Sequence, residues 1–210
     1  MATHIPEVVI LRLPSYLRAL TLLEEGNAGV VSSQELGARL QMTPAQIRKD
    51  LSYFGKFGKQ GKGYNVSQLL GELRQILGLD RDWSVALIGV GRVGKAILDY
   101  GDLAPRGFQV VAAFDRDPEL IGKVVGGLVI QDIADLAATV KDRGIAIAII
   151  AVPPSQVQQV IDCVVRCGIK AILNYAPVAA QLPKDIRLRE IDPVLAMQTM
   201  TYYLKTLSSS

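Results

Sequence analysis

The feature that most limits how this chain can fold is a glycine loop between an apolar strand and a helix. Residues 84–88 predict a buried strand, and residues 95–98 predict the helix. The loop between them consists of Gly89, Val90, Gly91, Arg92, Val93 and Gly94. A second predicted strand, residues 109–114, ends in Asp115, which lies 21 positions beyond Gly94. A strand, a G-x-G-x-x-G loop, a helix and an acid about 20 residues later form the pattern of a dinucleotide-binding βαβ unit.

Each residue type in this pattern has its own physical role. Gly89 permits the tight turn, Gly91 lets the backbone approach a pyrophosphate, and Gly94 lets the helix pack closely on the strand. The helix N-terminus offers N–H groups and a partial positive charge to phosphates. Asp115 accepts hydrogen bonds from ribose hydroxyls and disfavours a 2′-phosphate, so the pattern predicts NAD(H) over NADP(H), although Arg116 opposes this preference. The alternative is a purely structural glycine turn, which the strand, the helix and the acid together disfavour.

The rest of the chain after residue 80 continues as an α/β domain. Apolar strand-like runs alternate with amphipathic segments, which predicts a Rossmann-like, doubly wound parallel sheet. Further strands are expected at residues 128–130, 145–151, 171–173 and 186–191, and helices at 132–141 and 156–167. Such sheets bind ligands at the carboxyl ends of their strands. We therefore expect Val152 and Pro153, and also Asn174 and Tyr175, to lie over the nicotinamide half.

The chain before residue 80 has the signals of a helix-turn-helix. A helix is predicted over residues 16–25, and Ser32 with Glu35 forms a capping box that opens a second helix. Thr43, with Pro44 in the first turn, opens a third. The glycine- and lysine-rich residues 55–66 then predict a hairpin. A further helix, capped by Ser67, is expected over residues 67–77.

Basic residues concentrate on one side of the third helix and on the hairpin. Ile47, Leu51 and Phe54 share the face that is expected to pack inward, and residues 48–62 carry five basic side chains against one acid, Asp50. A recognition helix in the major groove, with a wing that follows phosphates, explains this arrangement. The alternative is a solvated basic face. The candidate DNA-binding residues are Thr43, Gln46, Arg48, Lys49, Ser52, Tyr53, Lys56, Lys59 and Lys62.

The composition argues against several kinds of site and identifies no ligand by itself. A net charge of +3 over 210 residues is too small to indicate a nucleic-acid ligand by itself. The single histidine, His4, makes a histidine-based catalytic or metal site improbable, so no metal is expected. Cys163 and Cys167 lie on one helix face, where packing or a redox role remain open. No membrane span or signal peptide is found, which predicts a cytoplasmic protein with no membrane partner.

The final predicted helix, residues 194–207, is unusually apolar. It can close the core of its own domain or pack on a second subunit. The expected organisation is a winged-helix DNA-binding domain at residues 1–80, a dinucleotide-binding domain at 81–192 and a dimerisation helix at 193–210.

A winged helix joined to a dinucleotide fold in this length resembles the Rex family of bacterial redox-sensing repressors. The resemblance rests on residues 46–55, 58–66, 88–94 and 113–115, and on the stretch from Met197 to Leu204. It implies a homodimer that exchanges its C-terminal helix and binds palindromic operator DNA when NADH is low. NADH would release the DNA, and NAD would compete with it. The resemblance also implies a redox switch in which Asp192 pairs with Tyr100 in one state and with Arg18 in the other.

Two other functions remain possible at this point. The first is an NAD-dependent enzyme such as a dehydrogenase, with Tyr175 and Lys170 as an acid–base pair. Against it, the second domain holds little more than the cofactor fold and no histidine. The second is a repressor that binds another nucleotide such as coenzyme A, against which Asp115 indicates a free ribose diol. We therefore predict a repressor and not an enzyme.

Overall fold

The computed structural model describes residues 5–59, 62–176, 178 and 181–207. Its contacts divide the chain into two units, residues 1–81 and 82–210, one residue beyond the boundary expected at residue 80. The two units are described separately below.

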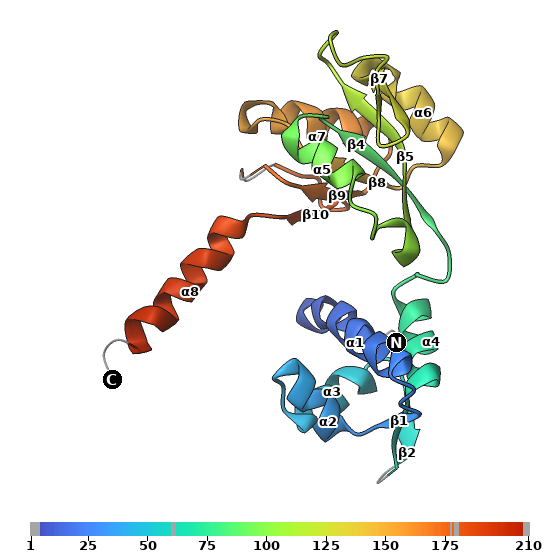
Figure 1. Ribbon diagram of the computed structural model, residues 1–210, viewed down its shortest axis with the longest axis vertical. Helices are drawn as coiled ribbons and strands as arrows, with labels where there is room; N and C mark the ends of the chain where they lie inside the picture. The colour runs from blue at the N-terminus through green and yellow to red at the C-terminus, as the bar shows by residue number, and fades with distance from the viewer. Residues whose placement is uncertain (1–4, 60–61, 177, 179–180, 208–210) are drawn as a thin grey trace. The chain divides into compact units, whose positions relative to one another are not determined.

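The first unit is a winged helix (Figure 1). Its helices are α1 (Glu7–Glu25), α2 (Ser33–Leu40), α3 (Pro44–Ser52) and α4 (Val66–Ile76). Its strands are β1 (Val30–Val31), β2 (Gly58–Lys59) and β3 (Gly63–Asn65), which form an antiparallel sheet in the order β1-β3-β2. Helices α2 and α3 form the helix-turn-helix, and β2 and β3 form the predicted hairpin.

The caps predicted for α2 and α3 are confirmed. The hydroxyl of Ser32 accepts a hydrogen bond from the Glu35 amide at 3.0 Å, and the hydroxyl of Thr43 accepts one from the Gln46 amide at 3.2 Å. Each bond satisfies one of the N–H groups that a helix leaves free in its first turn. The two caps fix where the recognition helix and its partner begin.

Two predicted helix starts are wrong. Helix α4 is capped by Asn65, whose side chain accepts from the Gln68 amide at 2.8 Å, and not by Ser67. Helix α1 begins at Glu7 and runs through Pro14, whereas the prediction began after this proline. Burial explains the longer helix, because Val9 and Leu13 continue the buried stripe of α1 and offset the backbone hydrogen bond that Pro14 cannot make.

The second unit is built on a seven-stranded sheet in the order β10-β9-β8-β4-β5-β7-β6. Its strands are β4 (Trp83–Ile88), β5 (Phe108–Asp115), β6 (Val124–Val125), β7 (Leu128–Asp132), β8 (Ile147–Ile150), β9 (Ala171–Asn174) and β10 (Arg187–Glu190). Its helices are α5 (Arg92–Leu98), α6 (Leu136–Arg143), α7 (Val157–Arg166) and α8 (Pro193–Leu207), with short 3₁₀ turns η1 (Ala104–Arg106), η2 (Ile133–Asp135) and η3 (Pro154–Gln156).

Six of these strands are parallel, and β6 is an antiparallel addition that was not predicted. Numbered in chain order, the parallel strands lie in the order 3-2-1-4-5-6, which is the Rossmann arrangement. The chain reverses direction across the sheet between β4 and β8. Ligands bind at this switch point, beyond the carboxyl ends of the strands.

Both faces of the sheet are buried, as a parallel sheet requires. Along β4, Ala86 and Ile88 join one apolar cluster, with α6 and α7, while Val85 and Leu87 join the other, with Ile97 of α5. The strands therefore read as apolar runs because each residue faces one of two cores.

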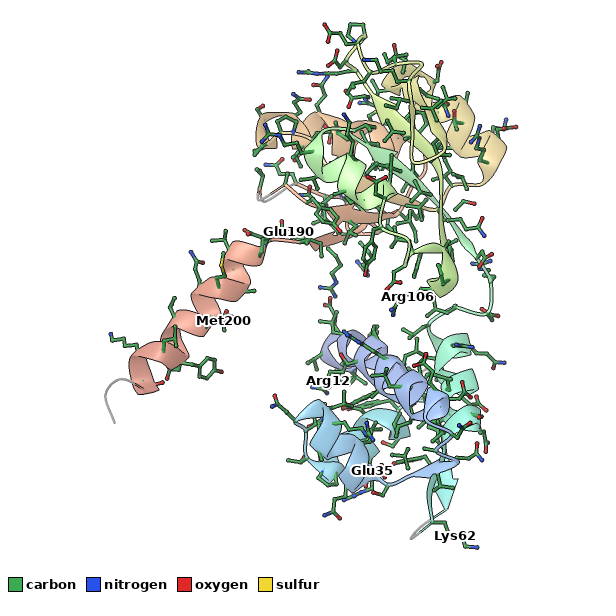
Figure 2. All side chains as sticks on the ribbon, in the orientation of Figure 1. Arg12, Glu35, Lys62, Arg106, Glu190 and Met200 are labelled. Atoms are coloured by element: carbon green, nitrogen blue, oxygen red, sulfur yellow. The ribbon has the colours of Figure 1, made fainter. Side chains whose placement is uncertain are left out.

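Helix α8 packs differently from the other helices. All its described side chains, residues 193–206, are exposed in the single chain. Its large apolar side chains are 49% to 66% exposed: Val194, Leu195, Met197, Met200, Tyr202, Tyr203 and Leu204. The alternative that α8 closes the core of its own domain therefore does not hold for the single chain (Figure 2, Met200).

Candidate functional site

The three loop glycines occupy three different environments. Gly89 has φ +93°, and a Cβ there would lie 2.6 Å from the Ala151 carbonyl oxygen. A Cβ at Gly94 would overlap the carbonyl oxygen of Gly89, so only glycine lets α5 approach β4 this closely. A Cβ at Gly91 would meet nothing within 4 Å. Packing within its own domain therefore does not require a glycine at position 91, and the backbone there is open to a ligand.

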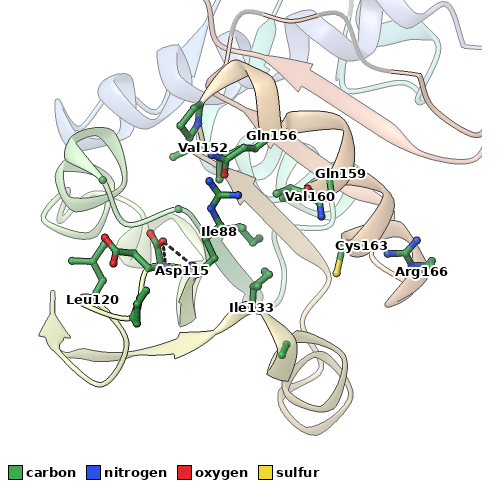
Figure 3. Close-up of a pocket in the computed structure, with 18 residues that line it drawn as sticks. Ile88, Asp115, Leu120, Ile133, Val152, Gln156, Gln159, Val160, Cys163 and Arg166 are labelled. Atoms are coloured by element: carbon green, nitrogen blue, oxygen red, sulfur yellow. Dashed lines mark hydrogen bonds between the residues drawn. The ribbon is translucent and has the colours of Figure 1, made fainter.

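A cavity of about 720 Å³ opens at the switch point (Figure 3). The carboxyl ends of β4, β5 and β8 form one side of it, and α7 forms the other. Six of the predicted cofactor residues line it: Gly89, Gly91, Asp115, Arg116, Val152 and Pro153. The place, the size and the lining all suit a bound dinucleotide.

Asp115 ties the end of β5 to the glycine loop. Its carboxylate accepts hydrogen bonds from the backbone amides of Val90 at 2.7 Å, Arg116 at 2.8 Å and Asp117 at 3.0 Å. These bonds hold a half-buried carboxylate at the rim of the cavity (Figure 3). An ionised carboxylate has about four acceptor positions, so it retains capacity for a ligand hydroxyl.

The other predicted cofactor residues do not line the cavity. Val90 is buried, and Arg92 and Val93 are exposed at the start of α5. Asn174 is fully buried at the end of β9, where its side chain bonds to the amide and the carbonyl of Ala176. Tyr175 is half-buried against the core that contains α5. Asn174 therefore shapes the loop after β9.

Part of the cavity wall was missed by sequence reasoning. Gln156, Gln159, Cys163 and Arg166 line it from η3 and α7 (Figure 3). The amphipathic pattern of α7 was visible, but which sheet edge its polar side faces depends on the strand order. Cys163 and Cys167 are free thiols. The pKa of Cys167 is raised, mainly because the thiol is buried and also because Cys163 lies next to it.

The acid–base pair of the enzyme alternative is not assembled. Lys170 lies just before β9 and Tyr175 just after it, so they lie at opposite ends of a strand and are separated by about 16 Å of extended chain. The Lys170 ammonium instead pairs with Asp185 at 3.2 Å. These two side chains cannot act on one substrate atom.

In the first unit, a cleft with two basic side chains in its wall lies between α3 and the wing. The cleft has a volume of about 740 Å³, and Arg48, Ser52 and Lys56 line it. Arg48 donates a hydrogen bond to the hydroxyl of Ser33 at 2.9 Å, which holds its guanidinium at this edge. Lys49 is also exposed.

The remaining predicted DNA-binding residues differ in exposure. Lys62 is exposed at the start of the wing's second strand (Figure 2), and Thr43 is exposed at the start of α3. Tyr53 is half-buried. The backbone of Lys59 belongs to β2, and its side chain lies outside the described residues.

Asp50, the one acid in the basic segment, does not lie on the basic surface. Its side chain is fully buried and accepts hydrogen bonds from Arg12, Tyr16 and Gln46. Burial alone would raise the pKa of Asp50, but these three donors hold it below its ordinary value. The same burial and the bond to Asp50 raise the pKa of Tyr16. The signal was available, because residue 50 lies between the buried positions Ile47 and Leu51.

The predicted switch residues are distributed over both units. Arg18 is exposed on α1 of the first unit. Tyr100 is 59% exposed after α5, with its hydroxyl 3.5 Å from a carboxylate oxygen of Asp102. Asp192 accepts a hydrogen bond from the Val194 amide at 2.8 Å and so caps α8.

No helix in the described part of the chain has both the length and the apolar character to cross a membrane. Among the same residues, no group of three His, Cys, Asp or Glu side chains gathers as metal ligands would.

Two protein families match separate parts of the chain. Residues 80–178 match the family described as "CoA binding domain", and residues 4–52 match "Putative DNA-binding protein N-terminus". A curated protein of Chloroflexus aggregans, named "Redox-sensing transcriptional repressor Rex", is 52% identical over 199 residues, which cover 95% of this chain and 94% of the relative.

Solved structures match the whole chain as well. RSP in complex with beta-NAD+ and operator DNA has a TM-score of 0.91 and 35% identity, covering 98% of this chain and 95% of that one. RSP in complex with beta-NADH has a TM-score of 0.89 and 33% identity, covering 98% and 97%. RSP is described as a Rex-family repressor.

Proposed function

The chain belongs to the Rex family of redox-sensing transcriptional repressors, and we propose that it binds operator DNA through its winged helix and releases it when NADH fills the cavity of the second unit. The family regulates transcription, so the prediction that the chain is not an enzyme is confirmed. The observation that carries the proposal is the cavity at the switch point, with an unobstructed Gly91 and a fixed Asp115, in a chain that also holds a basic winged helix.

NAD(H) suits this cavity better than coenzyme A. Both molecules offer a pyrophosphate to the glycine loop, but coenzyme A carries a 3′-phosphate on its adenosine ribose. The Asp115 carboxylate would repel that phosphate, whereas it can accept hydrogen bonds from a free ribose diol. The match to a CoA-binding domain keeps coenzyme A as the second candidate. RSP, which is 33% identical, has been solved with NADH.

We propose that the active form is a homodimer in which α8 is exchanged. The exposed apolar side chains of α8 need a partner surface, and a second copy of the chain supplies one with two-fold symmetry. A two-fold dimer presents two recognition helices to the half-sites of a palindrome. Replacing Met200 or Leu204 by lysine should therefore yield monomers in sedimentation experiments and weaken operator binding.

Release of DNA requires that NADH prefers the form that does not bind DNA. To move an equilibrium from 99:1 to 1:99, ligands must favour one state by about 10⁴-fold, which is about 100-fold per site in a dimer with two sites. The glycine loop and Asp115 contact groups that NAD and NADH share. The preference must therefore arise near the nicotinamide.

Tyr100, Asp192 and Arg18 are the proposed source of that preference. Asp192 also caps α8, so its removal would alter two things at once. Asp192→Asn retains a capping side chain and removes the charge. We expect this variant to bind the operator and to lose most of its discrimination between NADH and NAD. An unchanged NADH response would remove Asp192 from the switch.

The test of the whole proposal is a binding assay with a labelled palindromic operator, selected from random DNA. NADH is titrated against a fixed NAD background, with coenzyme A in a parallel titration. Release by NADH alone supports the proposal, and release by coenzyme A alone would replace the ligand. DNA binding that ignores all three ligands would leave the winged helix without this regulator. Because a repressor acts where the chromosome lies, we place the protein in the cytoplasm.

A further inference from the structure

Asp50 is the fully buried carboxylate at the centre of the first unit. It lies on α3, and its side chain has 0% exposure. From α1, Arg12 donates to it through Nε at 2.6 Å and Nη2 at 2.8 Å, and the Tyr16 hydroxyl donates at 2.5 Å. The carboxylate therefore joins the recognition helix to α1 by three charge-assisted bonds.

A fourth bond to Asp50 comes from α3 itself. Nε2 of Gln46 donates to Oδ1 at 2.6 Å, one helical turn away. An ionised carboxylate only accepts hydrogen bonds, and the donors around Asp50 keep it ionised by lowering its pKa. Gln46 must therefore present its NH₂ group to Asp50, which fixes the orientation of the amide.

The carbonyl oxygen of Gln46 consequently faces the other way. Among the described residues, every buried side-chain nitrogen or oxygen has a hydrogen-bond partner, and none of the bonds found there involves Oε1 of Gln46. Oε1 is therefore accessible from outside. Gln46 is the third residue of α3, and the N-terminal residues of a recognition helix are those that contact base edges.

We propose that Asp50 is a positioning residue that locks Gln46 as a hydrogen-bond acceptor, so that Gln46 selects a base with an exocyclic amino group. In the major groove, adenine N6 and cytosine N4 are donors, whereas guanine O6 and thymine O4 are acceptors that Oε1 would repel. A free glutamine can rotate its amide and bind either kind. In the locked amide, Asp50 takes one N–H of Nε2, and the second N–H lies beside Oε1, where it can pair with adenine N7 while Oε1 accepts from N6. Gln46 therefore favours adenine, or cytosine through Oε1 alone, on the strand that it contacts. The inference rests on the proposed DNA-binding function.

Selection from a library with randomised half-sites tests this directly. The wild type should prefer adenine or cytosine by about tenfold at one position of each half-site. Gln46→Ala should lose the preference at that position and keep the others. Gln75→Ala removes the same side chain from an exposed position on α4 and should select the wild-type sequence.

Asp50→Asn separates positioning from general stability. The asparagine can donate as well as accept, so Gln46 regains both amide orientations and the same base position should become permissive. A merely structural loss would weaken binding to all sequences alike and leave their ranking intact. Chemical unfolding of the variant checks that its first unit, which contains Asp50, remains folded.

A base analogue gives an independent measurement. Replacing the selected adenine by purine, or the cytosine by 2-pyrimidinone, removes only the amino group. This should weaken wild-type binding by about tenfold and leave Gln46→Ala unaffected. Unchanged preferences in Gln46→Ala, or a wild-type preference for guanine or thymine at the position that depends on Gln46, would overturn the inference alone. Failure of the wild type to select any DNA would overturn the proposed function and this inference with it.

Discussion

Replacing Gly91 by alanine adds one methyl group at the point where the cavity meets the glycine loop. In the free protein that methyl group has no neighbour within 4 Å, and the backbone angles of Gly91, φ −72° and ψ −158°, lie in the extended region that alanine adopts. The substitution should therefore leave the free energy of unfolding unchanged or raise it by up to about 1 kcal/mol, because alanine has less conformational freedom than glycine in the unfolded chain.

The added methyl group becomes unfavourable only when the dinucleotide binds. A pyrophosphate that lies against the backbone of residue 91 must move outward to make room for the methyl group. Forcing an extra methyl into a packed contact costs about 1–3 kcal/mol, which corresponds to about a 5- to 150-fold loss of NADH affinity. Gly94→Ala should do the opposite. Its methyl group overlaps the Gly89 carbonyl, so this variant should unfold at a lower temperature.

Three measurements on Gly91→Ala distinguish these effects: thermal unfolding, NADH fluorescence titration and operator release. We expect normal stability, weak NADH binding and an operator complex that NADH no longer dissociates. Gly71→Ala, on α4 of the other unit, also meets nothing within 4 Å and serves as the matched control. If Gly91→Ala binds NADH as tightly as the wild type, the dinucleotide does not pass over residue 91, and our assignment of the cavity is wrong.

Four further predictions concern charged side chains. Asp115→Ala should weaken NADH binding about 10- to 100-fold and reduce the preference for NADH over NADPH in calorimetry, because the bonds to ribose and to the Val90 amide are both lost. Lys62→Gln should lower the salt dependence of operator binding by about one unit of slope without changing the selected sequence; a changed sequence would indicate base contact. Asp50→Ala should destabilise the first unit by about 3 kcal/mol in chemical unfolding, the low end for a broken ion pair, because Arg12 is 27% exposed and can be rehydrated. The stabilisation by Asp50 is complete above its ordinary pKa of 3.8 and is lost as the pH falls through the lowered folded value, so the Asp50→Asn variant should show a flatter acid transition than the wild type.

Local chemistry determines the parts of the fold that were predicted well. Ser32 and Thr43 each have a capping side chain at the right spacing, and both caps form. The start of α4 was misplaced because Asn65 and Ser67 are both good capping residues only two positions apart. Nothing local separates them, and the pairing of β3 with β1 decides for Asn65.

Residues that act through distant partners were harder to predict. Arg12 and Tyr16 reach Asp50 across 38 and 34 positions of sequence, so no local pattern connects them. The cavity wall formed by Gln159 and Arg166 likewise follows from the order of the strands, which places α7 beside the glycine loop. The glycine loop itself was predictable because its strand, turn and helix are contiguous.

If the dinucleotide occupies the cavity as proposed, ligand binding and redox sensing need different parts of the molecule. In the proposed complex, Gly91 and Asp115 contact the pyrophosphate and the adenosine ribose, which are identical in NAD and NADH. The two ligands differ by one hydride and by the positive charge of the nicotinamide ring. A carboxylate near that ring, such as Asp192 in the proposed switch, attracts NAD, and the attraction falls when a cation neutralises the carboxylate. The preference for NADH then depends on whether Asp192 is paired, and pairing with Arg18 would couple the choice of ligand to the unit that binds DNA.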